Sequence, residues 1–256
     1  MNIIEIPDGA EIHVAGAIFE PKFSQVLLVN NNAYKGKPLG VGIPGGRTST
    51  SALLERLQFI LGKKQGNWLE TQQKTEEPED WTTMLNRLFK YSDFINVLDQ
   101  IFEELQRLQQ KKCILWSDLS RGARDMLLRE KLCVEVKSET GVEKEELEIL
   151  NLLSYDIVTY PDKIIHRVIY FCSTEAVGIP RKHYKEEVDE SRWFDASFLP
   201  ETMYRNHRKI FENPAIGHLS DHWRKIKRRE KRYERLAKPE EPDEETLRAL
   251  FEWAKP

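Results

Sequence analysis

The chain has 256 residues, of which 32% are charged and 40% are hydrophobic, and its formal net charge is -3. This length is enough for one large domain or for a domain with an accessory unit, and the apolar content is enough for a core. The small net charge indicates neither a polyanion-binding protein nor one with an acidic tail.

Two strands are predicted near the N-terminus. Residues 14–19 are small and apolar, and residues 26–29 form a short apolar run that is typical of a buried strand. Residues 36–46 are rich in glycine and proline and end in Pro-Gly-Gly at 44–46. We expect this tripeptide to form a turn or loop.

A helical block is predicted over residues 51–112. Apolar residues recur at helical spacing over 52–61 and again over 81–112, on either side of a polar stretch. The apolar stripe must be buried against the domain or against a partner. We favour a structural cap, and the alternative is a lid or a homodimer interface that covers the site and selects the substrate.

The next predicted helix ends at Gly141 and carries two acids near that end. Ser117 or Asp118 is expected to cap the turn that leads into it. Glu135 and Glu139 are four residues apart, so they share a helix face and repel each other. Both also lie near the negative end of the helix dipole, which costs roughly 0.3–1 kcal/mol for exposed groups. A bound divalent cation would reverse both penalties, and the alternative is a solvated acidic face.

The strand pattern returns in the second half of the chain. Residues 149–160 and 164–172 are predicted to form two long strands, and residues 193–194 end a shorter one. A helix is expected to open at 199–200 and to continue to Ile210.

The tail from His218 is predicted to be a highly charged helix. Basic residues alternate with aromatic ones over 222–233, a composition that suits nucleic-acid phosphates. We favour a docked helix with one solvated face, because Trp223, Ile226 and Tyr233 lie close together on one side and an acidic run follows.

The cysteines and the N-terminal segment bear on location. Cys113, Cys133 and Cys172 are odd in number and widely spaced, which fits neither a disulfide framework nor a CxxC metal site. Residues 1–10 lack the pattern of a signal segment, and no apolar run is long enough to span a bilayer. We therefore expect a cytoplasmic protein that does not span a membrane.

These features resemble the Nudix family of Mg²⁺-dependent pyrophosphohydrolases. The family signature is a Gly-Gly loop, a glutamate, and a helix that ends in Arg-Glu-x-x-x-Glu-Glu-x-Gly-hydrophobic. Gly45 and Gly46 resemble the loop, and residues 135–142 resemble the end of the helix. Residues 187–194 and the Leu-Pro pair at 199–200 resemble the closing strand and the last helix.

The sequence departs from the signature in several places. A long insert separates the glycine pair from the helix, and no glutamate matches the one in the loop. Val134 replaces the arginine that orients the first glutamate in the family. Ser138 replaces the first member of the paired glutamates.

The resemblance implies an α/β fold (α+β in packing), with a mixed sheet between helices. The Nudix-like domain would comprise 1–50 and 113–215, with a helical insert at 51–112 and a charged helical extension at 216–256.

The resemblance also implies chemistry. Glu135 and Glu139 would hold Mg²⁺ or Mn²⁺, Glu135 with Glu187 or Glu190 would act in catalysis, and the amides of Gly45 and Gly46 would approach phosphate. The substrate would be a small nucleotide-type molecule in which a nucleoside diphosphate is linked to another group. The alternatives are a non-catalytic nucleotide-binding or protein-interaction module and an RNA-associated protein that uses the basic tail.

Overall fold

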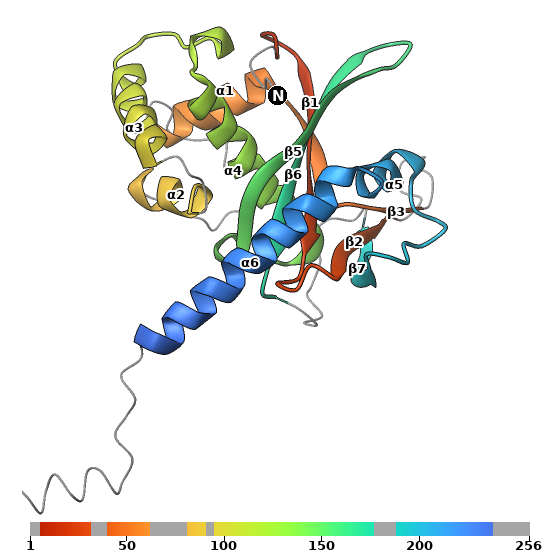
Figure 1. Ribbon diagram of the computed structural model, residues 1–256. Coiled ribbons are helices and arrows are strands. Elements are labelled where there is room, and N and C mark those ends of the chain that lie inside the picture. The colour runs from red at the N-terminus through yellow and green to blue at the C-terminus, as the bar shows by residue number, and fades with distance from the viewer. Residues whose placement is uncertain (1–5, 32–39, 62–80, 91–94, 177–187, 238–256) are drawn as a thin grey trace, which may run out of the picture. The chain divides into compact units, whose positions relative to one another are not determined.

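A computed structural model of the chain describes residues 6–31, 40–61, 81–90, 95–176 and 188–237 (Figure 1). The chain divides into two compact units, Met1–Ile216 and Gly217–Pro256. Among the helices in these ranges, none is long and apolar enough to cross a membrane. All three cysteines are free thiols.

The first unit is built on one mixed sheet of seven strands. The strands are β1 (Glu11–Phe19), β2 (Gln25–Asn31), β3 (Gly40–Gly42), β4 (Gly45–Ser49), β5 (Leu147–Thr159), β6 (Ile164–Thr174) and β7 (Val188–Asp195). The main order is β3-β2-β1-β6-β5, while β4 pairs with β1 and β7 pairs with β2. The β1–β6 pair is parallel, and the other pairs are antiparallel. The predicted long strands in the second half are confirmed as β5 and β6.

The expectation of a turn at residues 44–46 is wrong for its two glycines. Gly45 and Gly46 begin β4 and pair with Ala15 and Val14 of β1. A Cβ atom on Gly45 would lie only 2.4 Å from the carbonyl oxygen of Val14. Glycine is needed here because the two strands approach closely, and not because the chain turns.

Six α-helices occur in the described ranges. They are α1 (Thr50–Ile60), α2 (Trp81–Leu88), α3 (Ile95–Gln109), α4 (Arg121–Thr140), α5 (Arg205–Phe211) and α6 (Pro214–Ala237). The helical character predicted for the insert is confirmed by the first three, which Figure 1 shows grouped beside α4. The last helix before the tail begins at Arg205, later than predicted, because residues 201–202 form a turn and Met203 forms a β-bridge with Val41.

The helix α4 carries the motif that the sequence analysis singled out. Its N-cap is Ser120, whose hydroxyl accepts a hydrogen bond from the amide of Ala123 at 3.2 Å. Asp118 caps the 3-10 turn that leads into the helix, as predicted, because its carboxylate accepts a hydrogen bond from the amide of Leu115 at 3.0 Å. The helix ends as predicted at Gly141, which adopts a left-handed conformation with φ of 69°.

Helices cover both faces of the sheet in the first unit. On one face Gly46 of β4 meets the side chain of Glu135 of α4. On the other face the ring of His207 in α5 stacks on that of His13 at 6.4 Å. Gly46 pairs with Val14, so these two residues point to the face that α4 covers. His13 is the neighbour of Val14 on β1 and therefore points to the opposite face, which α5 covers. The predicted α/β class with a mixed sheet between helices is confirmed.

The apolar stripe of the insert is buried within the chain. Leu57 of α1, Leu88 of α2 and Leu105 of α3 belong to the same buried cluster as Leu128 and Val136 of α4. The insert therefore shares the core of the sheet domain, and its stripe needs no second copy of the chain to cover it.

The predicted helix in the tail is confirmed as far as Ala237 by α6, and the predicted remainder, 238–256, lies outside the described residues. Within the second unit, Arg224 pairs with Asp221 at 2.7 Å and Lys227 pairs with Glu230 at 3.7 Å. Part of the basic charge is therefore neutralised along the helix itself.

Candidate metal and phosphate site

The two acids near the end of α4 are buried. Glu135 is 4% exposed and Glu139 is 5% exposed, so the alternative of a solvated acidic face is wrong. Burial of a carboxylate is costly unless hydrogen bonds or opposite charges compensate it. The surroundings of each acid therefore decide what the pair can bind.

The glycine pair of β4 meets both acids. The amide of Gly45 donates a hydrogen bond to Glu139 Oε2 at 2.8 Å. A Cβ atom on Gly46 would lie 2.2–2.5 Å from the carboxylate atoms of Glu135, so that carboxylate fills space that only glycine leaves open. The fold thus brings together four residues that the sequence analysis assigned to one site, although the insert separates the glycines from the acids in the sequence.

Lys131 is a member of this site that sequence reasoning missed. Its ammonium group forms an ion pair with Glu135 Oε1, and both side chains are nearly buried. This lysine lies one turn before Glu135 in α4 and compensates its charge. The family signature has an arginine directly before this glutamate, at the position of Val134. The spacing of four residues between Lys131 and Glu135 was the available sequence signal.

Ser138 does not replace the missing acid. Its hydroxyl donates a hydrogen bond to the carbonyl oxygen of Glu135 at 2.9 Å, so it bonds to its own helix. The carboxylates of this site therefore come from Glu135 and Glu139.

The chain before the glycine pair is held from two sides. The amide of Gly16 donates to the carbonyl of Pro44 at 3.0 Å. The amide of Ile43 donates to His207 Nδ1 at 3.1 Å, which requires that nitrogen to be unprotonated. Burial, with smaller contributions from His13 and Arg167, lowers the pKa of His207 to about 3. His207 is therefore neutral near pH 7, and its Nδ1 atom accepts the hydrogen bond from the amide of Ile43.

The late acids have a different placement. Glu190 lies in β7 and pairs with Arg192 at 2.7 Å, and both line a separate cavity of about 400 Å³. Glu187 lies outside the described residues. Among the residues that the structure describes, no group of three or more His, Cys, Asp or Glu side chains is arranged to hold a metal ion.

Glu135 and Glu139 are the residues of this site that could hold a hard divalent cation. Mg²⁺ prefers oxygen ligands, keeps several waters, and usually binds through one or two carboxylates together with substrate phosphates. Glu135 and Glu139 supply two carboxylates that are already ordered beside Gly45 and Gly46. A cation bound there would, together with Lys131, compensate the negative charge of Glu135.

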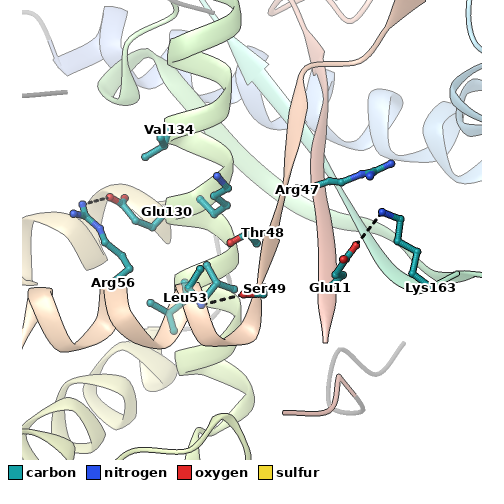
Figure 2. A pocket seen from close by; sticks show the side chains of 12 residues that line it. Glu11, Arg47, Thr48, Ser49, Leu53, Arg56, Glu130, Val134 and Lys163 are labelled. Atoms are coloured by element: carbon teal, nitrogen blue, oxygen red, sulfur yellow. Dashed lines mark hydrogen bonds and ion pairs between the residues drawn. The ribbon is translucent and has the colours of Figure 1, made fainter. Parts of the chain in front are cut away.

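A cavity of about 490 Å³ is lined in part by Lys131, the ion-pair partner of Glu135. Its walls come from β4, α1 and α4, with Glu11 of β1 and Lys163 from the turn before β6 (Figure 2). The lining residues are Glu11, Arg47, Thr48, Ser49, Ala52, Leu53, Arg56, Leu127, Glu130, Lys131, Val134 and Lys163.

Glu130 forms a buried charge cluster in the wall of this cavity. Its carboxylate lies 2.9 Å from Arg56, 3.1 Å from Arg87 and 3.6 Å from Lys144. Burial alone would raise the pKa of Glu130, but the three cations hold it below its usual value. The cluster ties α1 and α2 of the insert to α4, and sequence reasoning missed it because its members come from four separate elements.

The comparisons with known proteins give likeness to solved structures only. No family model and no curated protein matches the chain. It is similar to a NUDIX hydrolase from Nitrosomonas europaea, with 12% identity, a TM-score of 0.38, and coverage of 83% of this chain and 88% of that one. For a MutT NUDIX hydrolase from Burkholderia pseudomallei the values are 12%, 0.38, 80% and 98%. For a mutant of the Bacillus subtilis pyrophosphohydrolase BsRppH they are 17%, 0.35, 87% and 84%. The similar structures are Nudix hydrolases, but these identities and TM-scores are too low to establish membership of the family.

Proposed function

We propose that the chain is a divergent Nudix-type hydrolase that uses a divalent cation to cleave the diphosphate linkage of a nucleotide-type substrate. The observation that supports this most is the meeting of two buried carboxylates, Glu135 and Glu139, with Gly45 and Gly46 of β4. Burying two acids on one helix face lowers the stability of the fold. Without a cation to bind, apolar residues at these two positions would give a more stable protein.

Each residue has a role in this proposal. Glu135 and Glu139 would hold Mg²⁺ or Mn²⁺, which when bound would neutralise phosphate charge and lower the pKa of a water molecule. Lys131 is a positioning residue, because its ion pair orients the carboxylate of Glu135. Gly46 leaves the space that this carboxylate occupies.

The proton acceptor for the attacking water is the least supported role. Glu190 loses support because its carboxylate pairs with Arg192 in a separate cavity. Glu187 stays a prediction, since it lies outside the described residues.

A second candidate is a module that binds a nucleotide without cleaving it. The observation in its favour is that Lys131 already compensates Glu135, while Ser138 bonds to the helix backbone where the family signature has an acid. Such a site would keep a phosphate-binding role without the full set of acids that the signature supplies.

A turnover assay separates the two candidates. The chain is incubated with Mg²⁺ or Mn²⁺ and a panel of dinucleoside polyphosphates, sugar nucleotides and capped RNA, and released phosphate products are measured. We expect turnover of at least one class, with a loss of roughly 100-fold or more in kcat for Glu135→Gln and Glu139→Gln. Glu143→Gln is the matched control, because Glu143 pairs with Lys137 just beyond the helix. Binding of a panel member without turnover would favour the second candidate.

A further inference from the structure

We propose that the cavity between β4, α1 and α4 binds a phosphate chain, and that α1 of the insert supplies one wall of this second binding site. The class of ligand rests on the proposed function. The site itself depends on the cavity, its position and its charge, and it is testable without hydrolysis.

The cavity shares Lys131 with the pair of acids. Along β4, Gly45 and Gly46 face the two glutamates, and the next three residues, 47–49, line the cavity. Along α4, Lys131 pairs with Glu135 and also lines the cavity. A ligand in the cavity would therefore lie beside Lys131, the residue that pairs with Glu135.

Positive charge exceeds negative charge in the lining. The cations are Arg47, Arg56, Lys131 and Lys163, and the carboxylates are those of Glu11 and Glu130. The charge of Lys131 is also paired with Glu135, which lies outside the lining. Figure 2 shows that two of these cations form ion pairs with the lining carboxylates, Arg56 with Glu130 and Lys163 with Glu11.

Two cations outside the lining, Arg87 and Lys144, also pair with Glu130 and add to this excess of positive charge. The carboxylate of Glu130 is shared among three cations, so its negative charge is more than compensated. Arginine and lysine side chains in this arrangement suit phosphate oxygens, which accept several charge-assisted hydrogen bonds.

The first turn of α1 adds to the attraction. Ser49 and Ala52, the N-cap and third residue of the helix, line the cavity, and the first turn contains no acidic residue. The positive end of the helix dipole therefore favours an anion there. Leu53 and Leu127 make part of the wall apolar, which strengthens the interaction of charges inside.

The size of the cavity also fits more than one phosphate group. Its volume of about 490 Å³ lies within the range of small-ligand sites, roughly 300–1,000 Å³. We therefore expect it to accept a chain of linked phosphates, either free or carried by a nucleotide.

One substitution tests the cavity without disturbing the fold. Ala52→Glu places a carboxylate on a lining residue, at the position where a glutamate completes a capping box with Ser49. The change is therefore expected to keep α1 stable. Ser51→Glu is the matched control, because Ser51 is exposed in the same turn and does not line the cavity.

The measurement is calorimetric titration of the full chain with inorganic tripolyphosphate in EDTA and low salt. We expect the wild type to bind, Ala52→Glu to bind about tenfold or more weakly, and Ser51→Glu to change by less than about threefold. A wild type that does not bind, or equal weakening by the two glutamate substitutions, would overturn the proposal.

Two further titrations make the result specific. Glu139→Gln is expected to bind tripolyphosphate as the wild type does in EDTA, so failure of the metal site and failure of the cavity are distinguishable. Repeating the titration with adenosine triphosphate shows whether a nucleotide-borne chain enters as well as a free one. Ala52→Glu must bind more weakly than the wild type whichever of the two ligands is used. Equal affinities of the variant and the wild type for both ligands would contradict the proposal.

Discussion

The backbone amide of Gly45 donates a hydrogen bond to Glu139 Oε2 across 2.8 Å, which joins the first residue of β4 to the last turn of α4. The bond compensates part of the cost of burying Glu139. A Cβ atom at Gly45 would clash with the backbone of β1, so glycine allows the close approach of the two strands. The neighbouring Gly46 leaves room for Glu135, so each glycine contacts one of the two carboxylates.

Loss of the Lys131 ammonium group is predicted to lower the free energy of unfolding of the chain. Lys131→Met would leave Glu135 buried without its ion-pair partner, at a cost of about 3 kcal/mol in the free energy of unfolding. Lys131→Arg should retain most of the wild-type value, because it keeps the charge. Urea denaturation followed by circular dichroism measures the difference.

The control for this change is Lys137→Met. Lys137 pairs with Glu143, whose side chain is 45% exposed, so its removal should cost less than about 1 kcal/mol. Equal losses for the two methionine substitutions would show that the Lys131 pair has no special role.

Gly46→Ala is predicted to displace the carboxylate of Glu135. The added methyl group would lie within 2.5 Å of both carboxylate oxygens, so the strand or the side chain must shift. We expect a loss of about 1–3 kcal/mol in the free energy of unfolding. Gly217→Ala provides the contrast, because nothing lies within 4 Å of a Cβ atom there and alanine is the better helix former. The idea fails if Gly46→Ala is as stable as the wild type.

The neutral state of His207 predicts a loss of stability in acid. Its pKa is lowered from 6.5 to about 3, so below pH 6.5 the unfolded chain binds this proton more readily than the folded chain. The contribution of His207 is complete above about pH 6.5 and is lost as the pH falls towards 3, by up to roughly 1.4 kcal/mol per pH unit.

His207→Asn isolates this effect. The amide oxygen of asparagine is able to accept the hydrogen bond from the amide of Ile43, but it does not titrate. Denaturation curves between pH 7 and pH 5 should therefore show a smaller decline for the variant than for the wild type. Parallel declines would place the acid sensitivity elsewhere.

Several parts of the fold were predictable because they depend on local patterns. The end of α4 at Gly141 follows from a residue that adopts positive φ without strain. The strands β5 and β6 follow from long runs of strand-forming residues. The assignment of Gly45 and Gly46 to a turn failed because glycine marks close backbone approach as well as turns, and sequence alone does not distinguish the two.

The site was predictable in part. The spacing of Glu135 and Glu139 indicated a shared face, and the resemblance placed Gly45 and Gly46 beside them. Their burial was not predictable, because it depends on β4 and on the insert packed around α4. The cluster around Glu130 was hidden for the same reason, since Arg56, Arg87 and Lys144 meet only in the folded chain.

The melting temperature as a function of Mg²⁺ concentration tests most directly whether Glu135 and Glu139 form a divalent-cation site. At ten times the dissociation constant we expect the wild type to gain roughly 3 °C, Glu139→Gln to show no gain, and Glu143→Gln to behave as the wild type. A wild type that does not respond to millimolar Mg²⁺ or Mn²⁺, or an equal gain in Glu139→Gln, would contradict the assignment.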